Sequence, residues 1–425
     1  MPRLIYASAF AFVLLMPTLP ALAADDAELQ QLRERVRALE EHQQQSVAPQ
    51  ATPPAAPGYP TRVNPAPFNI GLTALFSGGG SSATDAELAN LQAGGHDPNR
   101  TGFTVQNVEL FIGGAIDPYL DGQANLIFLI DRKGETVVEL EEAFLTTRAL
   151  PYGLQAKAGQ FFTEFGRQNA QHPHTWAFVD QPVVLSRFFG GDGLRSQGLR
   201  IAWLTPLPWY SELYLGTQNA NGETVTSFLW APNETVGGYT LIDRGGARKA
   251  SDLLWSARWL NGVDISDTVS ANIGVSALSG PNASAINTDT HIYGVDAYLK
   301  WRPVVNQRGF PFVVWQTEWL TRDYETPANP LKDRGGYTQV LWGFKPRWVA
   351  GLRLEYADGK DDDGTDPLRD RRKRYSPNVT FYPTEFSKIR LQYNRDWAGH
   401  LVNNTANSVW LQWEFNLGAH TAHKF

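Results

Sequence analysis

The chain has 425 residues, with 37 Lys and Arg side chains against 43 Asp and Glu, and it contains no Cys. These numbers exclude a disulfide framework and a thiolate metal site, and the net charge of −6 argues against nucleic acid as a partner. No apolar run after the first 23 residues approaches the roughly 20 residues of a membrane-spanning helix, whereas Gly and aromatic residues are abundant, which favours strands and turns.

The first 67 residues are expected to lie outside the main fold. Residues 1–23 have the features of an export signal, with Arg3 before an apolar core and a small-x-small cleavage site at Ala21-Leu22-Ala23. Residues 24–46 predict a periplasmic helical, coiled-coil-like segment with an apolar row formed by Leu29, Leu32, Val36 and Leu39. It is either a solvated spacer or an oligomerising helix. Residues 47–67 are rich in Pro and predict an extended linker.

From Phe68 onward, apolar residues recur at every second position in segments of about ten residues, a pattern typical of strands with one apolar and one polar face. The last clear row contains Val409, Leu411, Trp413, Phe415 and Leu417. Sixteen such segments lie near 68–77, 103–116, 120–131, 136–148, 153–160, 194–204, 210–219, 250–261, 267–279, 291–302, 311–322, 334–345, 347–358, 371–382, 386–397 and 407–418. Most are long enough for a tilted bilayer crossing of ~9–11 residues.

The connections alternate between short and long along the chain. Most short ones carry Pro, as in Asp117–Tyr119 and Thr205–Pro208, and Asn261–Ser266 is a longer member of this class. Aromatic residues gather at the segment ends, for example Trp203, Trp319 and Trp397, where a membrane interface would hold them. Together these features predict an all-β fold: a sixteen-stranded antiparallel transmembrane β-barrel over residues 68–425, preceded by the helical extension.

The polar face of the predicted strands carries many charges, and sixteen strands enclose more space than side chains fill, so we expect a water-filled channel. The third long connection, residues 161–193, is rich in aromatic residues and is expected to fold into the barrel and narrow it. This inward course would bring Arg167, Arg187 and the adjoining Arg195 toward Arg200 and Glu109. The predicted pore-lining or constriction residues are Arg167, Arg187, Arg195, Arg200, Glu109, Lys157, Arg258, Lys300, Arg353, Glu355 and Arg390.

The stretch from Glu141 to Arg167, EEAFLTTRALPYGLQAKAGQFFTEFGR, resembles the signature of the phosphate-selective porin O and P family. Gly159-Gln160-Phe161 and Phe165-Gly166 fit that signature, while Phe162 and Glu164 replace the family's usual Lys and Pro. The resemblance implies a trimeric sixteen-stranded porin of a Gram-negative outer membrane, in contact with membrane lipid. It does not identify the solute, because basic and acidic residues alternate in the predicted lumen.

Other functions remain open alternatives to a porin for small polar or ionic solutes. His172 and His174 would ligate a metal ion in a zinc or other metal-uptake channel, but two histidines in a loop are more often polar surface, so we predict no metal site and no cofactor. Ser186, His172 and Asp180 could form a hydrolase triad, yet no nucleophile-elbow sequence surrounds Ser186, so we predict no enzyme. A barrel-anchored adhesin would be favoured if conductance were absent.

Overall fold

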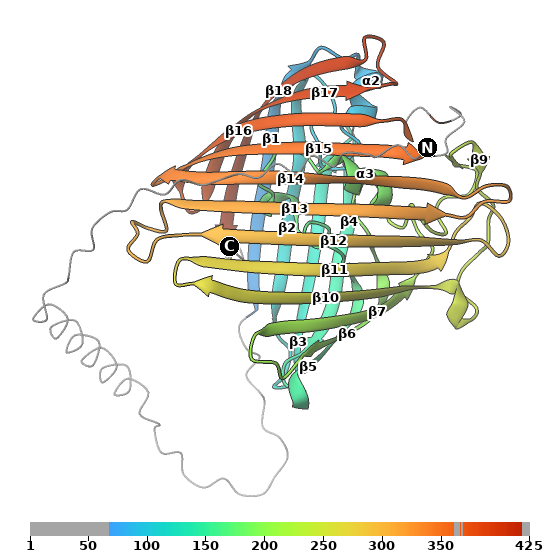
Figure 1. The fold of residues 1–425 in the computed structure, drawn as a ribbon, viewed down its shortest axis with the longest axis horizontal. Helices are drawn as coiled ribbons and strands as arrows, with labels where there is room; N and C mark the ends of the chain where they lie inside the picture. The colour runs from blue at the N-terminus through green and yellow to red at the C-terminus, as the bar shows by residue number, and fades with distance from the viewer. Residues whose placement is uncertain (1–67, 132, 361–365, 367–368, 419–425) are drawn as a thin grey trace, which may run out of the picture. The chain divides into compact units, whose positions relative to one another are not determined.

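The computed structural model describes residues 68–418, except for 132, 361–365, 367 and 368. The predicted export signal, helical segment and linker, and the chain end, lie outside these residues. Sixteen antiparallel strands form a closed barrel in which each strand pairs with its neighbours in the chain and β1 (Asn69–Ser81) closes onto β18 (Thr405–Gly418) (Figure 1). Closure gives every strand of the sheet two neighbours, which removes the free edges of an open sheet.

The sixteen predicted segments are confirmed as the sixteen barrel strands. Between β1 and β18, these are β2 (Gly102–Ala115), β3 (Leu120–Ile130), β4 (Thr136–Thr147), β5 (Leu154–Phe162), β6 (Arg195–Leu204), β7 (Tyr210–Asn219), β10 (Leu253–Ser266), β11 (Val269–Pro281), β12 (Asp289–Trp301), β13 (Phe312–Tyr324), β14 (Leu331–Lys345), β15 (Trp348–Lys360), β16 (Arg372–Thr384) and β17 (Ser387–Ala398).

One predicted connection is wrong. Asn261–Ser266 is the end of β10, and its residues pair with β11 up to Ser266 opposite Val269. Asn, Gly and Asp suggested a turn there, but Val263 and Ile265 continue the outward apolar row and are 53% and 60% exposed. The alternation therefore outweighs the turn composition, and the real turn is the two residues 267 and 268.

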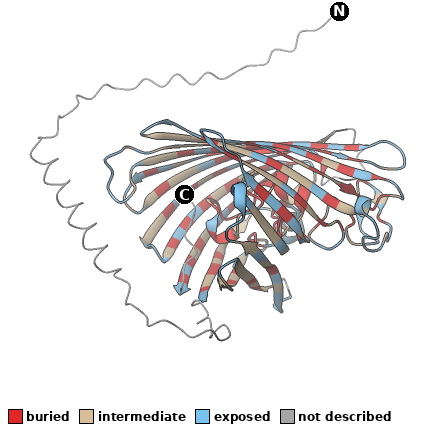
Figure 2. Cartoon of the chain, turned by 90° about the horizontal axis from the view of Figure 1, so that it is seen from below, coloured by how far each residue is buried: buried red, intermediate tan, exposed pale blue. Residues whose placement is uncertain are grey.

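The two faces of the barrel wall differ in the way that the alternation predicts. Along β18 the side chains of Trp410, Gln412 and Glu414 are buried inside, while those of Val409 and Leu417 are 50% and 57% exposed on the outer face. Figure 2 shows this alternation of buried and exposed positions along the strands. The exposed rings of Trp203 and Trp397 lie at the ends of β6 and β17, as predicted, whereas the exposed ring of Trp319 lies at the middle of β13. The outer face is thus suited to lipid.

β2 and β4 depart from the regular period of two because each contains a β-bulge, and further register shifts lie near the ends of β10, β14 and β16. On β2 the pairing with β1 shifts so that Gln106 has no partner, and on β4 the pairing with β3 skips Glu141. A bulge inserts one extra residue, so two consecutive side chains turn to the same face. Gln106 and Asn107 are both buried inside the barrel, as are Glu141 and Glu142.

The pairing between β4 and β5 covers only part of β4. It runs from Ala143 opposite Gln160 to Thr146 opposite Lys157, so the segment Thr136–Glu142 is paired with β3 alone. The amide of Gln160 donates hydrogen bonds to the carbonyl oxygens of Leu140 and Glu141 at this place. The barrel wall is therefore incompletely hydrogen-bonded between β5 and the first half of β4, Thr136–Glu142.

The long connections carry the few small elements outside the barrel wall. These are α2 (Asp85–Leu91), α3 (Val183–Phe189), the short 3-10 helices η1 (Pro151–Gly153), η2 (Pro173–Thr175) and η3 (Ala250–Asp252), and the small sheet of β8 (Thr235–Val236) and β9 (Tyr239–Thr240). A capping box between Thr84 and Glu87 starts α2. No helix within the described residues has the length and apolar character needed to cross a membrane. Among these elements, α3 lies within the barrel, against β14 and β15 (Figure 1).

Candidate functional site

The connection from β5 to β6, residues 163–194, runs through the interior of the barrel, and we call it the inner loop. It forms no sheet with the wall, so its backbone polar groups need partners from wall side chains. The amide N–H groups of Gln168, Val179 and Val183 donate to Glu318, Gln392 and Glu355 at 2.7, 2.9 and 2.6 Å. The ammonium of Lys388 and the guanidinium of Arg390 donate to the carbonyl oxygens of His174 and Trp176 at 2.6 and 2.9 Å.

The first sector of the inner loop meets an acidic part of the wall. Nε2 of His172 lies 3.0 Å from Glu142 Oε2, and its Nδ1 lies 2.8 Å from Glu141 Oε2 and 3.3 Å from Glu109 Oε1. Nδ1 of His174 lies 2.9 Å from Glu109 Oε2. The bulge in β4 is what brings Glu141 and Glu142 to this face together. The carboxylates of Glu109 and Glu141 hold the pKa of His172 well above its ordinary value, against the opposing effect of burial.

The second sector meets a basic part of the wall through Asp180, which is fully buried. Its carboxylate accepts hydrogen bonds from Arg353 at 2.5 Å and Arg374 at 3.0 Å. It also accepts from the amides of Gln92, Gln392 and Asn394. Burial alone would raise the pKa of Asp180, but the two guanidinium groups outweigh it and lower that pKa. Arg374 in turn pairs with Asp396 at 2.9 Å, so the sector is a network of buried ion pairs.

The third sector is apolar. Helix α3 places Val184, Leu185, Phe188 and Phe189 in one buried cluster with wall residues of β10 to β14, namely Leu254, Leu278, Ile292, Leu320 and Tyr337. Phe165 packs edge-on against Phe189 with ring centroids 5.2 Å apart. The apolar side chains of α3 therefore pack against apolar side chains on the inner face of this part of the wall.

The inner loop thus changes character along its length in step with the wall it passes. Its histidines lie beside glutamates, its aspartate beside arginines and its Phe and Val side chains beside Leu and Ile. Mismatched placement would leave buried charges unpaired, which costs several kcal/mol per ion by general estimates. The contacts therefore fix one course of the loop across the interior.

The predicted arginines of the inner loop do not meet at Arg200 and Glu109, and that expectation is wrong. The guanidinium of Arg167 lies over the Tyr298 ring at 3.7 Å, and Arg187 donates to the carbonyl oxygens of Arg369 and Asp370. Arg195, at the start of β6, pairs with Glu139. Each guanidinium has a different partner that is distant in the sequence, whereas Glu109 is occupied by the two histidines.

The other predicted pore-lining residues face inward, but most are buried in pairs and do not line open water. Arg258 pairs with Asp296, and Arg353 with both Asp180 and Glu355. Arg390 donates to Thr380, Gln412 and the inner loop, while Arg200 and Lys157 both pair with Glu164 of the loop at 3.0 and 3.2 Å. The inner loop covers these side chains, which period-two reasoning on separate strands does not reveal.

Partly exposed charges remain on the inner face and on the adjoining loop. Lys157 and Glu164 keep 16% and 17% of their side chains accessible, and Arg167 and Lys300 are also half-buried. Arg302 lies just beyond the end of β12 and is exposed. Both signs of charge therefore border the accessible part of the interior, with more basic than acidic groups in this set.

Several residues of the interior were not among the predicted site residues. Arg374 and Asp396 lie on β16 and β17 at inward positions, so the alternation could have identified them. His96 and Gln92 come from the connection between β1 and β2, and Glu141 reaches the interior only through the bulge. No pattern in the chain signals those three, because their positions depend on the path of connections and on a local irregularity of pairing.

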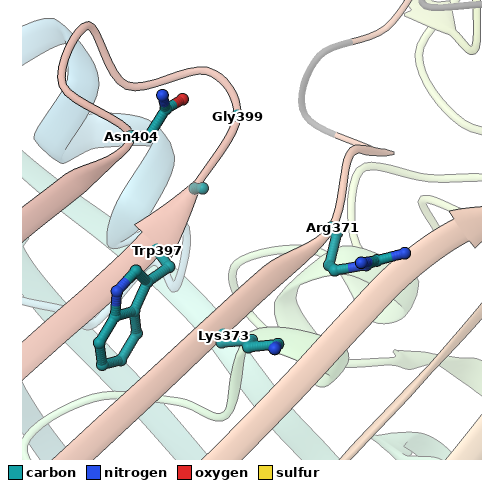
Figure 3. A pocket seen from close by; sticks show the side chains of 6 residues that line it. Arg371, Lys373, Trp397, Gly399 and Asn404 are labelled. Atoms are coloured by element: carbon teal, nitrogen blue, oxygen red, sulfur yellow. The ribbon is translucent and has the colours of Figure 1, made fainter.

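A cavity of about 460 Å³ lies on the wall between the ends of β16 and β17, away from the inner loop. Figure 3 shows its lining residues, among them Arg371, Lys373 and Trp397. Lys373 and Trp397 are opposite one another in the β16–β17 register and are exposed on the outward face. This cavity therefore belongs to the outer surface and not to the interior that the inner loop crosses.

Comparisons with known proteins agree with this architecture. The anion-selective porin from Comamonas acidovorans matches 82% of this chain and 98% of its own, with a TM-score of 0.50 and 9% identity. The outer membrane channel DcaP of Acinetobacter baumannii matches 83% of this chain and 96% of its own, with a TM-score of 0.52 and 12% identity. OprB of Pseudomonas putida matches 83% of this chain and 94% of its own, with a TM-score of 0.52 and 11% identity. At such identities the likeness shows the fold, which is that of outer-membrane porins.

No family model matches the chain. An uncharacterized protein of Aquifex aeolicus (strain VF5) is 33% identical over 390 residues, which span 84% of this chain and 80% of that protein. Identity at this level over most of both chains reflects common descent. The chain therefore belongs to the same family as this Aquifex aeolicus protein, and its barrel has the porin fold.

Proposed function

We propose that this protein is a porin: a passive channel for small polar or ionic solutes across the outer membrane of a Gram-negative bacterium. The observation that carries the proposal is a closed sixteen-stranded barrel with an apolar outer face and a charged interior. An apolar outer face suits lipid, and a barrel of sixteen strands is wide enough for an aqueous passage. The porin fold of the solved structures supports the same function.

The inner loop is the proposed constriction. It occupies part of the interior and is tied to the wall through each of its three sectors, so it reduces the open cross-section at a fixed place. The passage runs beside the charges that stay partly accessible, Lys157, Glu164, Arg167 and Lys300. Because these have both signs, we propose weak charge selectivity and no dedicated phosphate site.

The direct test is single-channel recording of the full mature protein in planar bilayers, with reversal potentials measured in asymmetric KCl. Discrete conductance steps with a small reversal potential are expected. A protein that folds as a heat-modifiable barrel but gives no conductance would refute the porin function and favour the adhesin alternative. A reversal potential close to the ideal value for one ion would refute weak selectivity.

The proposed orientation places the N-terminus and the short turns in the periplasm and the long connections outside the cell. Gly222 lies in the long connection after β7, and Asn306 in the connection between β12 and β13. A cysteine at Gly222 should be labelled on intact cells by an impermeant maleimide, and a cysteine at Asn306 should not. Labelling of Asn306 alone would reverse the orientation. The resemblance of the stretch from Glu141 to Arg167 to the phosphate-selective porin O and P family supports a homotrimer. Cross-linking of the protein in detergent is the test.

A further inference from the structure

We propose that Glu109, Glu141 and His172 form a binding site for one divalent transition-metal ion between the inner loop and the barrel wall. Each of the three residues offers one donor atom, and the three atoms lie within 4.8 Å of one another. Glu109 comes from β2, Glu141 from the bulge of β4 and His172 from the inner loop. The site therefore joins three segments that lie about 30 residues apart in the chain.

Two of the three donor residues, Glu141 and His172, lack hydrogen bonds at their donor atoms. Glu141 is 1% exposed, and within the described part of the chain neither of its carboxylate oxygens has a hydrogen-bond partner. Nδ1 of His172 likewise has none in hydrogen-bond geometry, although Glu141 Oε2 is only 2.8 Å away. A buried carboxylate that accepts no hydrogen bond is costly even beside the His172 ring, and a cation placed among these atoms lowers that cost.

The surrounding hydrogen bonds orient the donors as ligands. Nε2 of His172 faces Glu142 Oε2 at 3.0 Å, and a carboxylate oxygen accepts, so Nε2 carries a proton. A bound ion takes the place of the second ring proton on Nδ1, which lies beside Glu141 and Glu109. Glu109 is held by Asn125 Nδ2 at 2.5 Å and by His174 Nδ1 at 2.9 Å. A carboxylate behind a ligating imidazole is the usual arrangement around protein metal sites, because it fixes the ring and its tautomer.

A second imidazole, that of His96, lies near the other carboxylate oxygen of Glu141. Nδ1 of His96 lies 3.1 Å from the carbonyl oxygen of Gln106, and a carbonyl only accepts, so this Nδ1 carries the proton. In the neutral ring the lone pair is then on Nε2, which lies 3.9 Å from Glu141 Oε1 and 4.0 Å from Asp192 Oδ1. Lone pairs that face carboxylate oxygens at such spacing favour a cation between or beside them.

The donor set points to the class of ion. Imidazole nitrogen with carboxylate oxygen suits zinc and related first-row divalent ions, whereas Ca²⁺ and Mg²⁺ prefer oxygen alone. Three protein ligands leave a position for water. Bound here, the ion would fasten the inner loop to β2 and β4. This inference does not rest on conduction, because a site of this kind would also exist in a barrel that carries no current.

The test uses the full mature protein, folded in detergent and freed of metal by a chelator. His42, His420 and His423 lie outside the described residues, so the reference protein carries His42→Gln, His420→Gln and His423→Gln. Calorimetric titration with Zn²⁺ should give one saturable site, and Co²⁺ should give the visible absorption of a low-coordinate site. In this background, Glu141→Gln and His172→Gln should each weaken binding by at least the roughly tenfold to hundredfold that the loss of an outer-shell partner costs, because each removes a direct ligand.

The matched control is His291→Gln, because His291 is a histidine at an outward position on β12. It should leave the affinity unchanged. Heat-modifiable migration on gels verifies that each variant forms a barrel, and if His172→Gln fails, Glu141→Gln suffices, since the carboxylate oxygens of Glu141 have no hydrogen bond to lose. Absence of saturable Zn²⁺ binding in the reference protein, or unchanged affinity in a folded Glu141→Gln variant, would overturn the site.

Discussion

Arg353 shows how an inward-facing charge is held in this barrel. Its side chain is 2% exposed and donates to Asp180 at 2.5 Å and to Glu355 at 2.7 Å. The guanidinium also lies 4.5 Å from the centre of the Phe178 ring. Replacing both ions of such a pair with apolar groups can be neutral, but removing one leaves the other buried and unpaired. The main role of Arg353 is therefore to stabilise the packed interior of the barrel.

The substitution Arg353→Leu tests this role. It leaves the Asp180 and Glu355 carboxylates with one counter-charge fewer, so we expect a loss of about 3–5 kcal/mol in the free energy of unfolding. Urea unfolding of the barrel in detergent measures it. Arg334→Leu is the control, because Arg334 pairs with Asp358 on the exposed outer face and should lose no more than about 1 kcal/mol. Equal losses in both variants would contradict the ion-pair account.

Asp97 makes the stability depend on pH. It is buried beside Asp180, and burial together with the neighbouring carboxylate raises the pKa of Asp97 to about 7. The folded protein therefore keeps a proton that the unfolded chain has already lost above its ordinary pKa of 3.8. Raising the pH from about 4 through about 7 favours the unfolded chain, so this contribution to stability falls across that window.

The substitution Asp97→Asn removes this titration. The difference in urea midpoint between wild type and Asp97→Asn should change with pH between 5 and 8, with wild type losing relative stability as the pH rises. Asp85→Asn is the control, at an exposed position in α2. A difference that stays constant over this range would mean that Asp97 does not take up a proton in the folded protein.

At the scale of elements, the alternation was sufficient to locate all sixteen strands, because a wall with one apolar and one polar face repeats every two residues. It could not locate the bulges at Gln106 and Glu141, since an extra residue in one strand is visible only against its partner. It also could not pair the inner loop with the wall. Whether Glu109 meets His172 or Arg195 depends on the path of the loop through space, which the spacing of residues does not contain.

Deleting His172–Asp180 tests the inner loop as an element. The deletion removes its ties to the acidic and basic sectors, so the loop should withdraw from the wall. Single-channel conductance should rise and the reversal potential should move toward zero. Deletion of Ile242–Ala250, a mostly exposed stretch of the same length in another long connection, should leave both unchanged. Unchanged conductance after the first deletion would place the constriction elsewhere.

At the scale of the whole molecule, the outer face determines whether the barrel inserts. Leu352 is 38% exposed on the outward face of β15, where lipid chains would contact it. Leu352→Arg should make folding into lipid vesicles less favourable by about 2–4 kcal/mol, the destabilisation that Arg causes near the bilayer midplane. Leu352→Met controls for a change of shape alone and should be nearly neutral. If folding into vesicles is equal for both variants, this face does not lie in the membrane.

The incomplete pairing of β4 has a consequence for local opening of the wall. Along Thr136–Glu142, hydrogen bonds to β3 are formed, while the side toward β5 is bridged at Leu140 and Glu141 by the amide of Gln160. A strand held from one side opens at lower free energy than one held from both. Deuterium should therefore enter the amides of this segment well before those of β13 or β14, whose paired stretches run along both neighbours, and the wall should begin to fray here when the barrel is heated.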